Sequence, residues 1–184
     1  TRTDLLDALA DEGCGFDVAT GEELDLLDGI DRARIIHTHP IKKASEIAEA
    51  LAAGVRTFVV DNDGEPAKFA GTPDDVRLPI RLAYRSPMAK SDLYTKFGVG
   101  PFEAAHLVER ALERGIRIGG FGFHVGSQLD DPARFAAAIP ETLALMDHLE
   151  STLGVPFDTL DIGGGFPVAY DTAVTPLEDL AAVI

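Results

Sequence analysis

The sequence contains a single cysteine and no long hydrophobic run. Cys14 stands alone among 184 residues, so no disulfide can form within the chain, and this cysteine usage is typical of a reducing compartment. No apolar stretch approaches the roughly 18 residues that a membrane-spanning helix needs. We therefore expect a cytoplasmic protein that does not bind membranes.

Positive charge is scarce as well. Sixteen Lys and Arg residues stand against 31 Asp and Glu, which gives a formal net charge of −15. A negative field of this size repels nucleic acids and anionic surfaces. Hydrophobic residues make up 46% of the chain, so it is long and apolar enough for one globular domain with a sizeable core. We expect its partner to be a small molecule.

Motifs of several common chemistries are missing. There is no Ser-His-Asp nucleophile arrangement and no pair of cysteines at zinc-binding spacing. The triple glycine at 163–165 differs from the G-x-G-x-x-G dinucleotide fingerprint, and no lysine follows it as a P-loop requires. A candidate site has to come from other residues.

Helical and strand-like segments alternate along the whole chain, without a repeat or a linker. Strands are expected at 15–19, 34–38, 57–60, 77–84, 118–125 and 157–162, and the clearest helices at 4–12, 43–53, 102–114 and 132–153. The longest irregular connection is expected at 85–101. This pattern predicts an α/β fold with parallel strands, either an open doubly wound sheet or a closed (β/α)8 TIM barrel. In both, the ligand lies at the carboxyl ends of the strands.

Polar residues gather at those expected strand ends. They are Asp17, His37, His39, Arg81, His124, Ser127 and Gly163. The flat imidazole of His124 suits one face of a planar ring, and Ser127 offers a hydroxyl to a phosphate. The backbone N–H groups of 163–165 suit an anion. The simpler alternatives are a hydrogen-bonded core histidine and a tight turn.

Three charged residues have two interpretations each. Arg81 could pair with a phosphate or with an acidic partner in the fold. Asp17 and Glu23 could tune a site, or they could cap the helix that follows the first strand. His37 and His39 stand two apart, so a strand would point both to one face, as in the metal sites of barrel hydrolases. A metal site would still need further ligands.

Four segments resemble a known family. They are Gly15-Phe16-Asp17-Val18-Ala19-Thr20 with Glu23, Lys96-Phe97-Gly98, Phe123-His124-Val125-Gly126-Ser127, and Leu160-Asp161-Ile162-Gly163-Gly164-Gly165-Phe166-Pro167. In this order they are similar to the fold-type III, alanine-racemase-like decarboxylases that use pyridoxal 5'-phosphate, the ornithine, diaminopimelate and arginine group. The resemblance covers essentially the whole chain. It implies a (β/α)8 barrel, of which residues 1–184 would supply about strands 2–7.

The resemblance also implies roles for single residues. His124 would stack on the pyridine ring, and Ser127 with Gly163, Gly164 and Gly165 would hold the phosphate. Arg81 would lie against the cofactor. Asp17 would sit near the lysine that forms a Schiff base with the cofactor, and Glu23 would stabilise that neighbourhood. The implied reaction is decarboxylation of an amino acid.

Three parts of the family's equipment are not found in these residues. The first strand with the Schiff-base lysine is expected before Thr1, and the Glu-Pro-Gly-Arg stretch and the C-terminal β domain after Ile184. We therefore expect an inactive fragment, a partial cofactor-binding barrel, of an active parent that forms a homodimer.

The substrate implied by the resemblance is a basic or diamino amino acid. The ornithine or lysine type, in polyamine biosynthesis, is favoured, with the diaminopimelate type next. Two alternatives stay open on the residues alone. One is a metal-dependent barrel hydrolase using His37 and His39, and the other is a non-catalytic regulatory relative of the decarboxylases.

Overall fold

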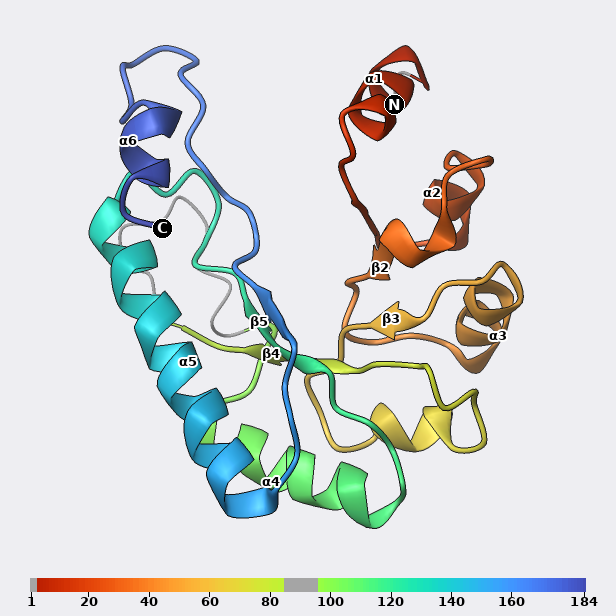
Figure 1. The fold of residues 1–184 in the computed structure, drawn as a ribbon. Helices are drawn as coiled ribbons and strands as arrows, with labels where there is room; N and C mark the ends of the chain where they lie inside the picture. The colour runs from red at the N-terminus through yellow and green to blue at the C-terminus, as the bar shows by residue number, and fades with distance from the viewer. Residues whose placement is uncertain (1–2, 85–95) are drawn as a thin grey trace.

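The computed structural model describes residues 3–84 and 96–184. Helices and strands alternate along these residues (Figure 1). The strands are β1 (Phe16–Val18), β2 (Ile35–His37), β3 (Thr57–Phe58), β4 (Pro79–Leu82), β5 (Gly120–Phe123) and β6 (Thr159–Asp161). The α-helices are α1 (Thr3–Asp11), α2 (Gly21–Asp25), α3 (Ala44–Ala52), α4 (Pro101–Glu113), α5 (Pro132–Leu153) and α6 (Leu177–Ala181), with 3-10 turns at Arg32–Arg34 and Pro66–Phe69.

The strands follow one another in space in the order of the sequence. They form two three-stranded parallel sheets, β1-β2-β3 and β4-β5-β6. Parallel bridges from Thr57 to Arg77 and from Val60 to Ile80 join the two sheets. Figure 1 shows α2 to α5 along the outer side of this curved surface. The expected incomplete (β/α)8 barrel with parallel strands is therefore confirmed, and an open doubly wound sheet is not, because its strand order would reverse.

Burial explains why these short segments form strands. All four residues of β5 are buried, and Ile80 and Leu82 of β4 are almost inaccessible to solvent. Sheets covered by helices read as continuous apolar runs, as here. Pro79 is the first residue of β4, where its missing N–H costs little, and its carbonyl still accepts from the Val60 N–H at 3.0 Å.

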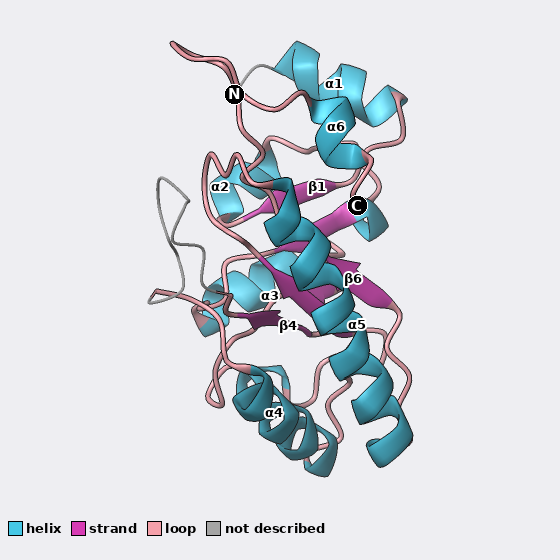
Figure 2. Ribbon diagram, turned by 90° about the vertical axis from the view of Figure 1, so that its left-hand side faces the viewer, coloured by secondary structure: helices cyan, strands magenta, loops and turns pink. Residues whose placement is uncertain are grey.

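The expected elements are found where the structure describes them, with shorter strands than predicted. The stretch 118–125 contributes only Gly120–Phe123 to the sheet. The helix at 132–153 runs its full 22 residues from the Asp131 N-cap to left-handed Gly154, and it lies in front of the strands in Figure 2. The expected loop 85–101 lies largely outside the described residues. Within the described residues, no helix is long and apolar enough to cross a membrane.

Candidate cofactor-binding site

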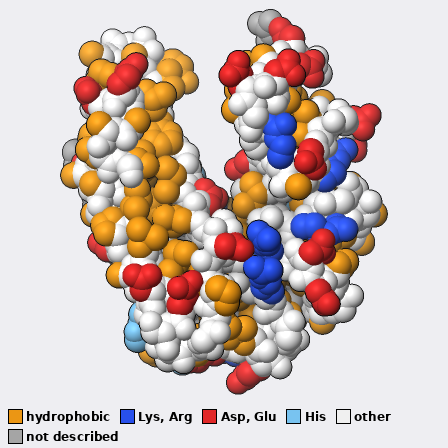
Figure 3. Space-filling view, viewed as in Figure 1, with side chains coloured by type: hydrophobic (Ala, Val, Ile, Leu, Met, Phe, Trp, Pro, Cys, Tyr) orange, Lys and Arg blue, Asp and Glu red, His pale blue; other side chains and the backbone are white. Residues whose placement is uncertain are grey.

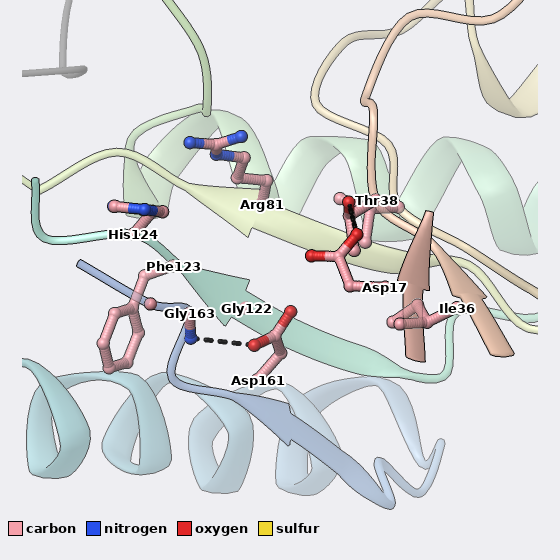
Figure 4. A pocket seen from close by; sticks show the side chains of 11 residues that line it. Asp17, Ile36, Thr38, Arg81, Gly122, Phe123, His124, Asp161 and Gly163 are labelled. Carbon is pink, nitrogen blue, oxygen red and sulfur yellow. Dashed lines mark hydrogen bonds between the residues drawn. The ribbon is translucent and has the colours of Figure 1, made fainter. Parts of the chain in front are cut away.

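A cavity of about 410 Å³ lies at the carboxyl ends of the strands (Figure 4). Its size is that of pockets for small ligands. It is lined by residues from all six described strands and the positions that follow them: Asp17, Ile36, Thr38, Val59, Arg81, Gly122, Phe123, His124, Asp161, Gly163 and Gly164. Because the strands are parallel, the polar residues at their ends meet at one edge, as the sequence indicated.

The histidine segment and the glycine segment are in direct contact. A Cβ on Gly163 would lie 2.2 Å from the Phe123 carbonyl oxygen, and one on Gly165 would lie 2.9 Å from Cε1 of the His124 ring. Both glycines also have φ values, +68° and +89°, that other residues rarely adopt. The two strand ends therefore form one wall of the cavity, and the close packing of their backbones explains two of the three glycines.

Gly164 has a different environment. Its φ is not in the left-handed region, and a Cβ built on it would meet no atom within 4 Å. Neither packing nor backbone conformation requires glycine here. The residue lines the cavity. The missing side chain therefore leaves room at the wall, beside backbone groups of the kind that bind anions.

His124 presents a neutral ring to the cavity. Burial and the nearby positive charge of Arg81 lower the pKa of its imidazole below the usual value. Its Nδ1 accepts a hydrogen bond of 3.1 Å from the Gly126 N–H, which holds the ring in place. A neutral, fixed imidazole suits stacking on a planar group better than it suits pairing with a phosphate.

Asp17 and Asp161 bring negative charge to the cavity. Burial of the Asp17 carboxylate raises its pKa, and Asp161 raises it further, although part of the residue remains exposed. Thr38 donates a hydrogen bond to Asp17, and the Gly163 N–H donates to Asp161 Oδ1 at 2.8 Å (Figure 4). Sequence reasoning assigned no role to Thr38 or Asp161. The available signal was the position of Asp161, two residues before the first of the three glycines.

Arg81 supplies positive charge to the cavity. It projects from β4 between His124 and Asp17 (Figure 4). Burial lowers the pKa of its guanidinium, and the carboxylates of Asp61, Asp161 and Asp17 oppose that shift. Its guanidinium carbon lies 5.0 Å from the centre of the Phe97 ring.

The remaining residues singled out from the sequence do not line the cavity. Ser127 is half-buried outside the cavity lining, and Gly165 is outside it as well, next to the His124 ring. Glu23 belongs to a capping box on α2: its carboxylate accepts from the N–H groups of Ala19 at 2.6 Å and Thr20 at 3.2 Å. These hydrogen bonds directly support the interpretation of Glu23 as a helix-capping residue.

The two histidines of the metal alternative do not share a face. β2 ends at His37, so the alternation of a strand does not extend to His39. His37 is buried and stacks on Phe58, whereas His39 is exposed and makes a T-shaped contact with Phe97. Among residues 3–84 and 96–184, no three His, Cys, Asp or Glu side chains are grouped as metal ligands.

No lysine lines the cavity in the part of the chain that the structure describes. Lys42 is buried, but its Nζ donates to the carbonyl oxygens of Val59 at 2.5 Å and His39 at 2.9 Å. Lys43, Lys68 and Lys96 are exposed. The described residues therefore line the cavity without a lysine amine that could bind a cofactor covalently.

Comparison with known proteins identifies the chain's relatives. Among curated proteins, it is 38% identical to ornithine decarboxylase of Panagrellus redivivus over 98% of this chain and 41% of the relative, and 33% identical to antizyme inhibitor 2 of Xenopus laevis over 96% and 39%. Among solved structures, it matches the lysine/ornithine decarboxylase of Vibrio vulnificus, complexed with cadaverine, with a TM-score of 0.89 and 40% identity. That match covers 99% of this chain and 47% of that one.

The chain thus spans less than half the length of these relatives. The family model for the pyridoxal-binding domain of pyridoxal-dependent decarboxylases matches all residues from 1 to 184. The expected cofactor, pyridoxal 5'-phosphate, is supported by this match. The chain, an incomplete barrel with a cavity at its strand ends, belongs to the pyridoxal-dependent decarboxylase family and matches its pyridoxal-binding domain.

Proposed function

We propose that the cavity binds pyridoxal 5'-phosphate and that the parent protein decarboxylates a basic amino acid. The observation that carries the proposal is the contact between the His124 ring and the glycine segment, with Gly164 left open beside it. His124 would cover one face of the ring and exclude water from it. The backbone N–H groups of Gly164 and Gly165, with the hydroxyl of Ser127 at the edge of the cavity, would hold the phosphate, and Gly163, whose own N–H donates to Asp161, would shape the wall beside it.

The charged residues would hold the rest of the cofactor. Arg81 would lie against the ring side of the cofactor. Asp17, which accepts a hydrogen bond from Thr38, would sit near the lysine that binds the cofactor. The chemistry supplied by the bound cofactor is an electron sink for the pair left on the α-carbon when carbon dioxide departs. Glu23 would act indirectly, since its capping of α2 holds the residues that follow Asp17.

We propose further that these residues form a partial domain of the parent. Segments outside residues 1–184 would supply the first strand with its lysine and a C-terminal β domain, and the parent would be a cytoplasmic homodimer. The preferred substrate is ornithine or lysine, with diaminopimelate next. The names of the relatives, ornithine and lysine/ornithine decarboxylases, support this order.

The test uses the full-length protein. After incubation with pyridoxal 5'-phosphate and removal of the excess, we expect a visible absorbance band and release of carbon dioxide from ornithine or lysine faster than from diaminopimelate or arginine. His124→Ala should weaken cofactor binding. A parent that gains no visible band would contradict the proposal.

A non-catalytic, regulatory relative is the second candidate. The match to a protein named antizyme inhibitor 2 favours it, since that match also spans nearly the whole chain. The same assay separates the two functions. A parent that releases no carbon dioxide from any of the four amino acids would support the regulatory candidate.

A further inference from the structure

The Lys96-Phe97-Gly98 segment carries no role in the proposed function, yet Phe97 contacts Arg81, which lines the cavity. We propose that Phe97, anchored through Asp61, is a positioning residue that holds the Arg81 guanidinium in place for the cofactor. This inference rests on the proposed function. It assigns to Phe97 a task that acts through Arg81 rather than by touching the reacting atoms.

The contact between Phe97 and Arg81 is a cation–π interaction. The guanidinium carbon lies 5.0 Å from the ring centre, within the range at which the ring quadrupole attracts a cation. In the part of the chain that the structure describes, no ion pair or side-chain hydrogen bond fixes the direction of the Arg81 guanidinium, and the contact found for it is the one with the Phe97 ring. Arg81 is half-buried and has a flexible side chain. Without a contact that fixes its direction, ligand binding would cost the conformational entropy of ordering that side chain.

The backbone around Phe97 is itself pinned to β4. The Val99 N–H donates to the Arg81 carbonyl at 3.0 Å, and the Ala83 N–H donates to the Val99 carbonyl at 2.9 Å. An isolated parallel bridge between Leu82 and Val99 thus places this segment beside β4. Phe97 is therefore tied to the same strand that carries Arg81.

Asp61, three residues after the end of β3, provides a second anchor. Its side chain is buried, and Oδ2 accepts the Gly98 N–H at 3.0 Å. Asp61 also lies close enough to Arg81 to favour its charged form. One carboxylate therefore fixes the backbone next to Phe97 and helps to keep the cation beneath the ring charged.

Gly98 is required for this close approach. Its φ is +90°, and a Cβ would lie 2.8 Å from backbone atoms of Leu82 and Ala83. A residue with a side chain would push the segment away from β4 and carry Phe97 with it. The Phe97 ring also contacts the His39 ring, with 5.8 Å between the ring centres and the two planes nearly perpendicular. The fixed backbone of Gly98 and the His39 ring therefore both limit the movement of Phe97.

The experiment measures cofactor affinity in the full-length protein. We expect Phe97→Leu to raise the apparent Kd for pyridoxal 5'-phosphate about five- to thirty-fold, which is the strength of a partly desolvated cation–π contact. Phe97→Tyr keeps the aromatic face and should stay close to the unaltered protein. The control is Phe102→Leu, on the exposed surface of α4. Thermal melting of the cofactor-free variants checks that each has folded.

A double-mutant cycle decides whether Phe97 acts through Arg81. In an Arg81→Met background, Phe97→Leu should change the Kd by less than twofold. An equal loss in both backgrounds, or unchanged affinity of Phe97→Leu, would overturn this inference alone. If the unaltered protein binds no pyridoxal 5'-phosphate, the proposed function fails first.

Discussion

Single residues in the glycine segment respond to different physical demands. Gly163 and Gly165 are needed because the neighbouring backbone leaves no space and their φ values are positive. Gly164 meets neither condition. It is the one glycine of the three for which space for a ligand would explain the missing side chain. This difference gives a prediction that separates folding from binding.

We expect Gly164→Ala and Gly163→Ala to fail in different ways. Gly164→Ala should change the free energy of unfolding by less than about 0.5 kcal/mol but raise the Kd for pyridoxal 5'-phosphate roughly tenfold or more, because a displaced phosphate loses charge-assisted bonds worth about 1.5–3 kcal/mol each. Gly163→Ala should destabilise the fold by at least about 1–2 kcal/mol, the cost of a left-handed residue. Chemical denaturation and cofactor titration measure the two effects. Equal destabilisation by both variants would contradict the prediction.

His37 gives a residue-scale prediction about pH. It is buried against Phe58, and burial together with the nearby charge of Lys42 lowers the pKa of its imidazole to about 4. Between pH 4 and 6.5 the unfolded chain binds the proton and the folded chain does not. The free energy of unfolding should therefore fall as the pH drops from 6.5 toward 4.

Replacing His37 by phenylalanine should flatten this pH dependence. The measurement is urea denaturation at several pH values between 4 and 7. The matched control is His148→Gln, because His148 is exposed on α5. If the slope with pH is the same in His37→Phe as in the unaltered chain, the buried histidine is not its source.

At the scale of single elements, the junction of β1 and α2 connects the site to a helix cap. Asp17 lies in β1 and reaches the cavity, and Glu23 closes the capping box three residues after Thr20. A residue that stabilises a helix start near a site influences that site without contacting its ligand.

Glu23→Gln should therefore preserve the helix-capping hydrogen bonds that Glu23→Ala removes. Glu23→Ala is expected to lower the free energy of unfolding by about 0.3–1.5 kcal/mol, whereas Glu23→Gln, which still accepts backbone N–H groups, should retain most of it. Denaturation measures stability, and cofactor titration measures the site. Large loss of cofactor affinity in Glu23→Gln with stability intact would mean that the charge, not the cap, matters.

At the scale of the whole molecule, the described barrel is open. β1 and β6 each pair on one side only among the residues described. Figure 3 shows apolar side chains gathered along the column formed by α5, α6 and the segment between β6 and α6. Exposed large apolar residues in this column are Leu143, Val168, Tyr170 and Leu177. Unpaired edges and apolar patches favour association.

Residues 1–184 expressed alone should therefore self-associate. We expect sedimentation velocity to give a mass that rises with protein concentration, and a hydrophobic dye to fluoresce when bound. Tyr170→Ser with Leu177→Ser should reduce both signals, whereas Leu5→Ser, in α1, should have a smaller effect. A concentration-independent monomer that binds no dye would contradict this view of the open surface.

The sequence alone determined the alternation of helices and strands, the parallel α/β fold and the two segments that meet at the site, because apolar periodicity and glycine positions are local properties. It could not decide whether His37 and His39 point to the same face, as two metal ligands would, because that depends on where β2 ends. Only the tertiary structure brought Thr38 to Asp17 and Phe97 to Arg81, and gave Gly164 its open side. These contacts join segments distant in the chain, so they depend on how strands pack and not on any pattern within one segment.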